Sequence, residues 1–386
     1  MRFELDEAQR ALYERFRRLG EAGLGADVVD RDKVSRFSHA DWEHCAENGV
    51  QGLLLPTEYG GGGHSTVEYV SAMEGLGHGC PDNGLLMSLG AHILAVGVPI
   101  LAFGDEDQRV RYLPRLAAGT AIGANAMTEP GTGSDALALT TTAERAAGGY
   151  RLTGRKCYVT NAPVADVFVV YATVDPELGF TGVTAFLVER DDGGLSVVEG
   201  EEKLGLRTAP WGVLELDGCF VPDSRVLGAV KQGAAVFARS MSWERAMLMA
   251  PWLGVLRRET AECVGYSRRR RQFGKHIGHF QSVSHRLVDL HLREELCRMV
   301  TYRAAHALTT EDPGYLPEMS KLYTSEAVVE AFTAAGQIYG ALGYTAGSRV
   351  ERNLRDAIGM TISSGTSDLQ RKIIAGRLGL SWPERY

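Results

Sequence analysis

The pattern of apolar residues changes twice along the chain, and this feature limits most strongly which folds the sequence can adopt. From Leu5 to about Ala118, apolar residues recur at three- and four-residue spacing, which is typical of amphipathic helices. Between Ile122 and Gly228, short β-rich runs separated by Gly, Asp and Pro take over, and from Gly233 the helical spacing returns. The sequence therefore predicts a helical domain, a mostly antiparallel β domain and a second helical domain, in that order.

The fold class that this order predicts is α+β. The length supports several domains, because 386 residues exceed what one ordinary core holds. We place the domains at residues 1–121, 122–229 and 230–386. Five runs in the middle part have the composition of strands: YRLTGRKCYVTNA, DVFVVYATV, GVTAFLVE, LSVVEG and GVLELDGCFVP.

The net charge is −7, so the chain has no overall attraction for nucleic acid or for an anionic membrane. Residues 83–104 lack Asp, Glu, Lys and Arg, but His92, Pro99 and several glycines interrupt them, which favours a buried core helix over a membrane span. The six cysteines show no C-x-x-C spacing, and the first residues, MRFELDEAQRALYERF, have no export signal. We therefore expect a cytoplasmic protein without a disulfide scaffold.

Two kinds of cofactor site are disfavoured. The glycine-rich residues 23–25 and 60–63 do not follow a strand within a βαβ unit, which is the context that a dinucleotide fingerprint requires. Four histidines lie close together, but no cysteine or carboxylate stands at the spacing that would complete a tetrahedral metal site with them: His276, His279, His285 and His291. We expect neither a Rossmann site nor a metal site.

The stretch AMTEPGTGSD, residues 126–135, opens the predicted β domain and carries the first candidate ligand groups. Thr128 and Ser134 supply hydroxyls, a Pro-Gly turn follows Glu129, and Gly133 lets a ligand approach the backbone. Such a turn suits a flavin ring edge and a phosphate. A plain turn at the entry to a strand explains the same residues equally well.

The same stretch resembles the signature segment of the acyl-CoA dehydrogenase family, and further family-like segments follow in the family's order. They are GYRLTGRKCYVTNA, EKLGLRTAP, RRRQFGKHIGHFQ, QIYGALGY and RDAIGMTISSGTSDLQ. Together they span nearly the whole chain. The resemblance implies a helical N-terminal domain, a β-barrel-like middle domain and a C-terminal four-helix bundle.

The resemblance also implies FAD as the cofactor. On one subunit the expected FAD contacts are Asn125, Met127, Thr128, Gly133, Ser134, Tyr158, Val159, Thr160, Thr366, Ser367 and Asp368. Across a subunit interface they are Arg270, Arg271, Gln272, Phe273, Phe280, Gln281, Gln337, Ile338, Tyr339, Gly340 and Ala341. A site shared in this way implies a homo-oligomer, by analogy a tetramer built as a dimer of dimers.

One position departs from the family pattern. Many members have a catalytic glutamate immediately before Gly-Thr-Ser, where this chain has Ser364. Glu244 offers a replacement, because it interrupts an apolar helical stripe formed by Phe237, Met241, Leu248 and Trp252. A buried carboxylate has a raised pKa and can act as a general base, and some family members carry their base at this Glu-Arg position. We expect Glu244 to be the base; an ion pair is the structural alternative.

The reaction implied by the resemblance removes an α proton and a β hydride from a thioester-activated acyl group. The α proton is acidic enough only if hydrogen-bond donors stabilise the enolate-like oxygen. In the family these donors resemble a ribityl hydroxyl of FAD and the backbone N–H at the position of Ser364. Glu244 would take the proton, while the flavin takes the hydride from the opposite face. Further expected substrate contacts are Ser134, Ser242, Trp243, Arg245 and Gly365, although Arg245 could equally orient its helix.

The combination of SMSWERAM with TISSGTSDLQ most resembles the subgroup that oxidises prolyl groups tethered to peptidyl carrier proteins, on the way to pyrrole-2-carboxyl units of antibiotics and other secondary metabolites. The partner would then be an acyl or peptidyl carrier protein, which Arg268 and Arg269 could dock unless they are only a solvated charge run. The alternatives are a short- or branched-chain acyl-CoA dehydrogenase, a flavin monooxygenase and a non-catalytic flavin- or thioester-binding protein. Either oxygen or an electron-transfer flavoprotein would reoxidise the flavin.

Overall fold

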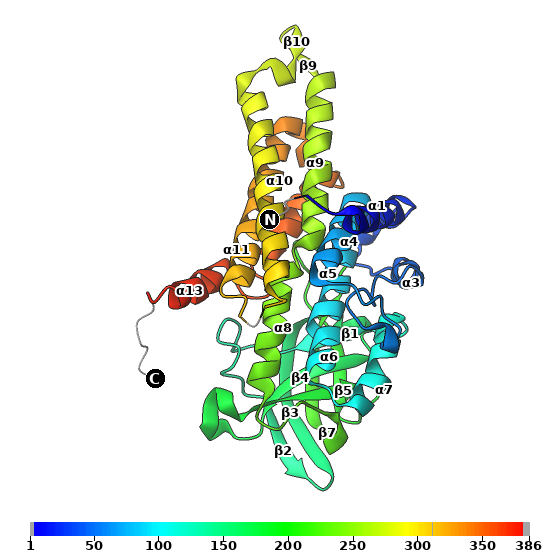
Figure 1. Cartoon of the computed structure of the whole chain (residues 1–386), viewed down its shortest axis with the longest axis vertical. Helices are drawn as coiled ribbons and strands as arrows, with labels where there is room; N and C mark the ends of the chain where they lie inside the picture. The colour runs from blue at the N-terminus through cyan, green and yellow to red at the C-terminus, as the bar shows by residue number, and fades with distance from the viewer. Residues whose placement is uncertain (1–3, 311, 381–386) are drawn as a thin grey trace.

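The computed structural model describes residues 4–310 and 312–380. The chain begins with a layer of helices at one side of the molecule (Figure 1). Their bounds are α1 Glu7–Glu21, α2 Val28–Lys33, α3 His39–Glu47, η1 Thr57–Tyr59, α4 Thr66–Gly79, α5 Asn83–His92, η2 Ile93–Gly97, α6 Val98–Phe103 and α7 Glu106–Ala117.

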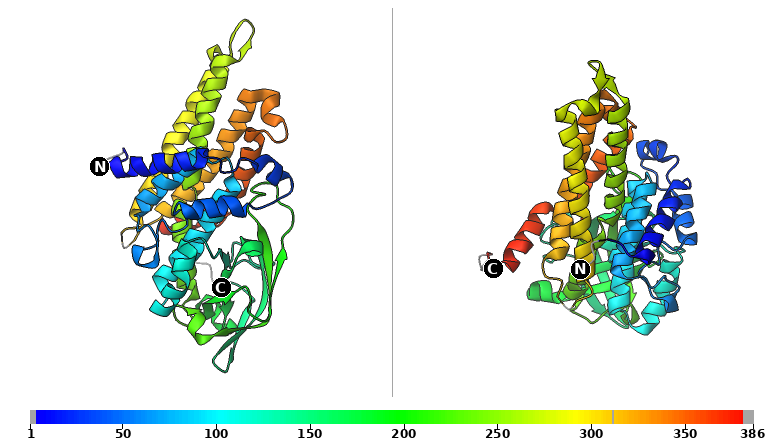
Figure 2. Two further views of the ribbon diagram at one scale, coloured as in Figure 1. Left: turned by 90° about the vertical axis from the view of Figure 1, so that its right-hand side faces the viewer. Right: turned by 45° about the horizontal axis from the view of Figure 1, so that its top comes forward.

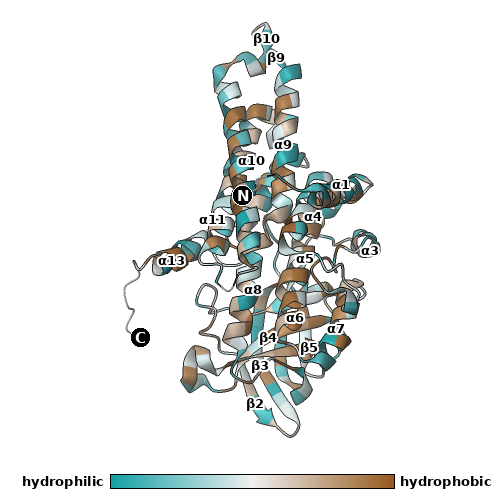
Figure 3. Cartoon of the chain, in the orientation of Figure 1, coloured by the Kyte–Doolittle hydropathy of each residue, from teal (hydrophilic) through white to brown (hydrophobic). Residues whose placement is uncertain are grey.

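The uncharged stretch after α4 forms one helical rod made of α5, the π-helical η2 and α6. By length and composition this rod could cross a membrane, but 83% of its most apolar window is buried inside the protein. Figure 3 shows α5 and α6 in brown, at the centre of the molecule. Even its histidine is satisfied internally, since His92 Nδ1 accepts from the Gly123 N–H at 3.0 Å and Nε2 lies 3.1 Å from the Leu116 carbonyl oxygen. The predicted core helix is confirmed.

The middle of the chain forms a single strongly curved sheet. Its elements are β1 Gly123–Ala126, β2 Thr142–Ala146, β3 Gly149–Thr160, η3 Ala162–Val164, β4 Val167–Thr173, η4 Pro176–Gly182, β5 Val183–Glu189, β6 Leu195–Glu199, β7 Trp211–Pro222, η5 Asp223–Arg225 and β8 Val226–Leu227. The strand order is β6-β7-β3-β2-β4-β5-β8, and β1 pairs with β4 in parallel. Apart from β1 and one β2–β4 bridge the pairs are antiparallel, which confirms the predicted β domain. All seven residues of β4 are buried, as expected for a strand covered on both faces.

The C-terminal part is helical again. Its elements are α8 Gly233–Met247, α9 Ala250–Arg269, β9 Arg271–Gln272, β10 Lys275–His276, η6 Ile277–His279, α10 Gln281–Ala307, α11 Leu316–Tyr339, η7 Gly340–Tyr344, α12 Arg349–Met360 and α13 Ser367–Arg377. The predicted apolar stripe ran through one continuous helix to Trp252, and that continuity is wrong, because the chain breaks between α8 and α9. Pro251 lies in the first turn of α9 and has no N–H to donate backwards, so it starts a new helix.

Helices α8, α9, α10 and α11 contact one another and form the predicted bundle. In Figures 1 and 2 the bundle stands upright, with the β9–β10 hairpin at its far end and the β domain at its base. The N-terminal helices pack against the bundle where α4 and α9 approach closely. The backbones are so near that a Cβ atom at Gly254 would lie only 1.9 Å from the Glu74 carbonyl oxygen, so only glycine fits there. Helix α8 lies at the junction of the bundle, the apolar rod and the β domain. Functional groups on α8 can therefore meet residues from all three parts.

Candidate active site

Glu244 lies on α8 with its side chain turned into the protein. As the apolar stripe predicted, the residue is buried, with 7% of its surface exposed. Its carboxylate accepts a hydrogen bond at each oxygen, from the Ser240 hydroxyl to Oε1 at 3.1 Å and from the Ser364 hydroxyl to Oε2 at 2.8 Å. No Lys or Arg forms an ion pair with it among the described residues. The structural alternative, a paired carboxylate, is therefore not what the geometry shows.

The surroundings of Glu244 set its protonation. Burial raises the pKa of this carboxyl above the ordinary 4.5, and the Ser364 hydroxyl, the Ser240 hydroxyl and the Arg245 charge lower it part of the way back. Burial wins because the donors are neutral hydroxyls and Arg245 makes no bond to the carboxylate. A carboxyl whose pKa is raised in this way is a stronger base than an ordinary exposed carboxylate.

The segment between α12 and α13 brings Ser364 to Glu244 from 120 residues away in the sequence. Ser364 has a left-handed backbone, φ 53°, and Gly365 follows with φ 92°. The Ser364 carbonyl oxygen is fixed from two sides, by Arg245 Nε at 3.3 Å and by Gln370 Nε2 at 3.1 Å. The Ser364 backbone N–H donates no hydrogen bond to any described residue. A left-handed non-glycine residue at such a place is typical of functional sites.

Arg245 fixes this loop rather than pointing freely at a ligand. Its Nη1 pairs with Glu318 of α11 at 3.0 Å while its Nε holds the Ser364 carbonyl. Lys321, one turn further along α11, donates to the Thr361 carbonyl oxygen at 2.9 Å. Burial, and then the Arg245 charge, lower the pKa of Lys321 to about 8. The orienting role that we left open for Arg245 is the one its contacts favour.

The remaining α8 residues predicted to touch substrate flank Glu244. Ser242 and Trp243 are half-buried, and the Arg239 guanidinium lies 5.2 Å from the centroid of the Trp243 ring. The Trp243 Nε1 atom is buried and has no hydrogen-bond partner in the described chain. An unpaired indole N–H beside the candidate base is available to a ligand.

Asn125 connects this group to the β domain. It is the third residue of β1, and its Nδ2 donates to the Ala95 carbonyl oxygen at 3.2 Å and approaches Ser240 Oγ at 3.4 Å. The segment that follows differs along its length. Met127 is buried, Thr128 is half-buried, and Gly133 and Ser134 are exposed.

A buried ion pair that the sequence did not reveal supports the 126–135 segment. Glu129, 3% exposed, accepts from Lys156 Nζ at 2.8 Å and from the backbone N–H and hydroxyl groups of Thr140 and Thr141. Lys156 is fully buried and also donates to the Met127 carbonyl oxygen at 3.1 Å. Burial opposes ionisation of Glu129, but Lys156 and the threonines outweigh it and hold the pKa at about 2. This pair clamps the start of the segment onto β3.

Tyr158 presents an exposed aromatic surface at the end of β3, next to a shift in the β3–β7 register. Its backbone is left-handed, φ 56°, and its ring lies 5.1 Å from that of Trp211 on β7. Val159 points into the core, so only its backbone can meet a cofactor, and Thr160 is half-buried. Trp211 was missed by the sequence analysis because only the strand pairing brings it beside Tyr158.

The residues expected to act across a subunit interface lie at the other end of the bundle (Figure 1). Helix α9 has 20 residues and is therefore about 30 Å long, which separates Arg268–Gln272 from Glu244 of the same chain. Phe273 is 92% exposed, and Arg270, Arg271, Gln272 and Gln281 are exposed too, with Phe280 half-buried. The structure thus does not bring these residues to Asn125. A carrier protein docked at Arg268 and Arg269 would not face Glu244 of the same chain.

The QIYGALGY segment lies at this same far end. The Tyr339 ring packs 4.6 Å from that of Tyr266 in the last turns of α9. Ile338 is buried, so the side chains of Ile338 and Tyr339 both pack within this chain. Gln337, Gly340 and Ala341 instead line a cavity of about 580 Å³ between α11, η7 and α12.

The last expected FAD contacts open α13. Thr366 caps this helix, since its hydroxyl accepts from the Leu369 N–H at 3.2 Å. Ser367 is half-buried, and the Asp368 side chain is 98% exposed. The buried Ser367 Oγ has no hydrogen-bond partner in the part of the chain that the structure describes, and Thr132 Oγ1 in the 126–135 segment shares this property.

These observations fit a flavin dinucleotide. Unpaired hydroxyls lie in two of the expected cofactor segments, an exposed aromatic side chain lies in a third, and the far-end residues line a cavity. Buried hydroxyls of native proteins normally have partners, so a polar ligand is the simplest partner for these.

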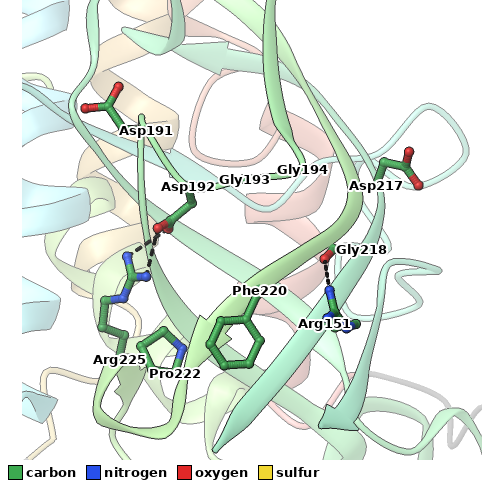
Figure 4. Close-up of a pocket in the computed structure, with 10 residues that line it drawn as sticks. All are labelled: Arg151, Asp191, Asp192, Gly193, Gly194, Asp217, Gly218, Phe220, Pro222 and Arg225. Atoms are coloured by element: carbon green, nitrogen blue, oxygen red, sulfur yellow. Dashed lines mark hydrogen bonds and ion pairs between the residues drawn. The ribbon is translucent and has the colours of Figure 1, made fainter. Parts of the chain in front are cut away.

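A second cavity of about 580 Å³ lies on the outer side of the sheet (Figure 4). Its two arginines already have partners within the lining, Arg225 with Asp192 at 2.7 Å and Arg151 with the Gly218 carbonyl oxygen at 3.2 Å. None of the residues predicted to bind cofactor or substrate lines it. We assign it no role.

The expectation that no carboxylate is spaced to join a histidine in a metal site needs correction. His291, Glu294 and Glu295 offer ligand atoms within 4.8 Å of one another, because positions three and four residues apart share a helix face. Glu294 is already engaged, however, lying 3.8 Å from Arg257 and 3.6 Å from His291. Acidic groups such as the exposed Glu295 are common without a metal, so this cluster alone is no evidence for one.

In a comparison with known proteins, three family models match consecutive segments that together cover most of the chain. The acyl-CoA dehydrogenase N-terminal, middle and C-terminal domain models match residues 6–120, 124–219 and 231–379. An L-prolyl-[peptidyl-carrier protein] dehydrogenase of Pseudomonas fluorescens is 44% identical over 89% of this chain and 91% of its own length.

Solved structures agree with the sequence matches. The prolyl acyl carrier protein oxidase AnaB superposes with a TM-score of 0.96 at 39% identity, covering 98% of this chain and 100% of that one. The structure of PigA with FAD and proline superposes with a TM-score of 0.95 at 38% identity, over 98% of this chain and 100% of that one. The fold predicted from the resemblance is thereby confirmed.

Proposed function

Because the chain belongs to the acyl-CoA dehydrogenase family, we propose that it is an FAD-dependent oxidoreductase that dehydrogenates a prolyl group held as a thioester on a peptidyl carrier protein. The observation that carries this proposal is the buried Glu244 carboxylate, which forms no ion pair with any described residue. It lies 2.8 Å from the hydroxyl of Ser364, a loop residue whose backbone N–H has no partner among the described residues. The proposal also draws on relatives named for prolyl carrier substrates, at 44% and 39% identity.

We propose that Asn125, Thr128, Gly133, Ser134, Tyr158 and the start of α13 hold FAD on one subunit, and that the far-end residues hold it from a second subunit. The unpaired Thr132 and Ser367 hydroxyls support the first half, and the cavity beside Gln337 supports the second. When bound, FAD would supply the acceptor for the hydride that leaves the substrate.

The chain's own groups would handle the proton. Glu244 takes the α proton, since it is a buried carboxyl beside Ser364, and burial raises its pKa and makes it a stronger base than an ordinary carboxylate. The free Ser364 N–H donates to the thioester carbonyl oxygen as negative charge develops there. Arg245 and Gln370 hold the Ser364 carbonyl so that the N–H keeps its direction. Trp243 Nε1 is a further donor toward the substrate.

The test is mass spectrometry of a prolyl-loaded carrier protein after incubation with the FAD-loaded enzyme. We expect the acyl group to lose two or four hydrogens, while prolyl-CoA and butyryl-CoA stay unchanged. Oxidation of butyryl-CoA but not of the prolyl carrier protein would establish the short- or branched-chain acyl-CoA dehydrogenase alternative. Bound FAD that no thioester bleaches would establish a non-catalytic binding protein. Oxygen consumption in the same reaction separates oxygen from an electron-transfer flavoprotein as the oxidant.

We also propose that the protein is a homo-oligomer, a dimer of dimers, in the cytoplasm, with the domain boundaries 1–121, 122–229 and 230–386. A row of exposed apolar side chains along α10 supports oligomer formation, and it consists of Val288, Leu292, Leu296 and Met299. The six cysteines are all buried and unpaired, as suits a reducing compartment. Light scattering of the purified protein, with Leu292→Glu as the disrupting variant, tests the assembly.

A further inference from the structure

The two serine hydroxyls that contact Glu244 come from different parts of the fold. Ser240 lies one helical turn before Glu244 on α8 and is fully buried, and it bonds Oε1 at 3.1 Å. Ser364 lies in the loop before α13 and bonds Oε2 at 2.8 Å. Each carboxylate oxygen therefore has one hydroxyl, which fixes the rotation of the carboxylate about its own axis.

Both hydroxyls are themselves fixed. Asn125 Nδ2, anchored on the Ala95 carbonyl oxygen, approaches Ser240 Oγ at 3.4 Å, so the Ser240 side chain is held from the β domain. Ser364 is held through its carbonyl by Arg245 and Gln370, and its left-handed backbone directs the hydroxyl at Oε2. A strained backbone that two side chains hold in place indicates that this direction matters.

We infer that Ser240 and Ser364 are positioning residues for the α-proton transfer, which clamp the Glu244 carboxylate in one orientation and keep it available as an anion. This inference rests on the proposed function of Glu244 as the base. The inference gives the Ser364 side chain a role in addition to that of its backbone N–H. Many family members carry the catalytic carboxylate at the position of Ser364, whereas here the Ser364 hydroxyl bonds a carboxylate on α8.

The consequence for pH dependence follows from the groups around Glu244. Among the described residues, the ionisable side chains near it include Arg245 on α8, Tyr171 on β4, and Glu318 and Lys321 on α11. The adjoining η2 and α6 contain no ionisable residue, Glu189 of β5 is engaged with Arg111, and α10 meets this region through Thr301, which bonds Ser320. A hydroxyl that donates to the charged form favours that form, so removing it should make Glu244 harder to ionise.

The experiment compares Ser364→Ala and Ser364→Gly with the parent FAD-loaded enzyme. The rate of flavin bleaching by prolyl carrier protein is measured without oxygen across pH. Both variants should move the acidic limb of the profile upward by about one pH unit, since a hydrogen bond to a charged group is worth about tenfold or more. The rate at alkaline pH should return to within a few-fold of the parent, with KM little changed. Glycine accepts the left-handed backbone readily, so Ser364→Gly removes the hydroxyl even if alanine distorts the loop.

Two further measurements sharpen the test. Ser363→Ala is the matched control, because the neighbouring hydroxyl donates to the Gly359 carbonyl oxygen instead, and its limb should not move. Infrared titration of the protonated carboxyl band that Glu244→Gln removes reports the same shift in enzyme without substrate. Ser240→Ala should shift the band in the same direction.

The positioning role is wrong if the carboxyl band and the acidic limb of the pH profile both stay in place in the two Ser364 variants. It is also wrong if these variants lower the bleaching rate equally at every pH. Failure of the proposed function looks different: Glu244→Gln would then bleach at the parent rate, and no carboxyl band would follow the limb. The two failures are therefore separable.

Discussion

Two buried glutamates, one in the β domain and one in the bundle, have opposite environments. Glu129 accepts five hydrogen bonds, one of them from the buried Lys156 ammonium, and its pKa is held at about 2 against the burial that opposes ionisation. Glu244 accepts two hydrogen bonds, both from hydroxyls, and burial raises its pKa. Both residues are less than one-tenth exposed, so burial alone does not separate them.

The two carboxylates differ in whether a buried cation and enough hydrogen-bond donors compensate the negative charge. A carboxylate with a bonded cation and full donors stays ionised and contributes to structure, whereas one with too few donors is poised to take a proton. Glu129 accordingly holds the proposed cofactor segment onto β3, and Glu244 faces the loop of Ser364.

The largest expected effect is on chemistry at Glu244. Glu244→Gln keeps the shape but removes the base, and we expect the rate of flavin bleaching by prolyl carrier protein to fall by about 10³-fold, the usual range for a general base. Stopped-flow spectroscopy under anaerobic conditions measures this rate. Glu129→Gln, where the protein retains FAD, should leave the pH profile of bleaching in place.

Glu294→Gln is the matched control for this prediction. Glu294 is also a buried bundle carboxyl, and burial raises its pKa too, but it lies on α10 beside Arg257. Its variant should bleach at the parent rate. Parent-like bleaching by Glu244→Gln would remove the distinction between the two buried glutamates.

The next largest effect concerns stability at Glu129. Lys156→Met leaves the Glu129 carboxylate buried without its cation, and breaking a buried pair from one side costs about 3–5 kcal/mol in the free energy of unfolding. The urea midpoint should fall accordingly, with loss of bound FAD. Arg155→Met is the control on the adjacent residue, because the Arg155–Glu215 pair is exposed and 3.6 Å long, and should change the unfolding free energy by less than about 1 kcal/mol. Equal effects of the two variants would contradict a clamping role for Glu129.

The sequence predicted one of these two glutamates and not the other, for a physical reason. Glu244 interrupts a helical stripe, and a three- to four-residue period is visible locally. The partners that define Glu129 and Glu244 are not local: Lys156 is 27 residues from Glu129, and Ser364 is 120 residues from Glu244. Contacts between residues so far apart in the sequence form only in the assembled fold. The Ser364–Glu244 hydrogen bond and the Glu129–Lys156 ion pair therefore could not be predicted from residue spacing.

The fold itself was predictable where the residues have strong preferences. The five β-branched runs became β3 to β7, and the apolar rod became the core. The strands β1 and β2 were missed because GANA and TAERA contain small or helix-favouring residues and are strands only through their pairing with β4 and β3. The resemblance to a family supplied the cofactor segments, and the structure added Trp211, Gln370, Glu318 and Lys321.

A smaller effect is the acid dependence of stability that Glu129 confers. Its folded pKa of about 2 lies below the ordinary 4.5, so its contribution is complete above about pH 4.5 and is lost as the pH falls toward 2. Glu129→Gln should lose about 3 kcal/mol relative to the parent at neutral pH, and the difference should shrink as acid protonates the parent. Urea midpoints measured from about pH 7 down to about pH 3 follow this convergence. A difference that is constant over that range would mean that the charge of Glu129 is not what stabilises the segment.

The smallest effect has the opposite sign and belongs to Glu244. Its folded pKa is raised above 4.5, so the folded protein binds this proton more tightly than the unfolded chain, and stability falls as the pH rises through the folded pKa. Glu244→Gln replaces the buried charge by a neutral group of the same size, and we expect it to stabilise the protein by about 1 kcal/mol above that pKa and by almost nothing near pH 4, where both forms are neutral. Urea midpoints of the inactive variant and the parent, with FAD bound in both, measure the difference. A variant less stable than the parent at neutral pH would mean that Glu244 is matched by its surroundings as Glu129 is, and that the division between the two glutamates does not hold.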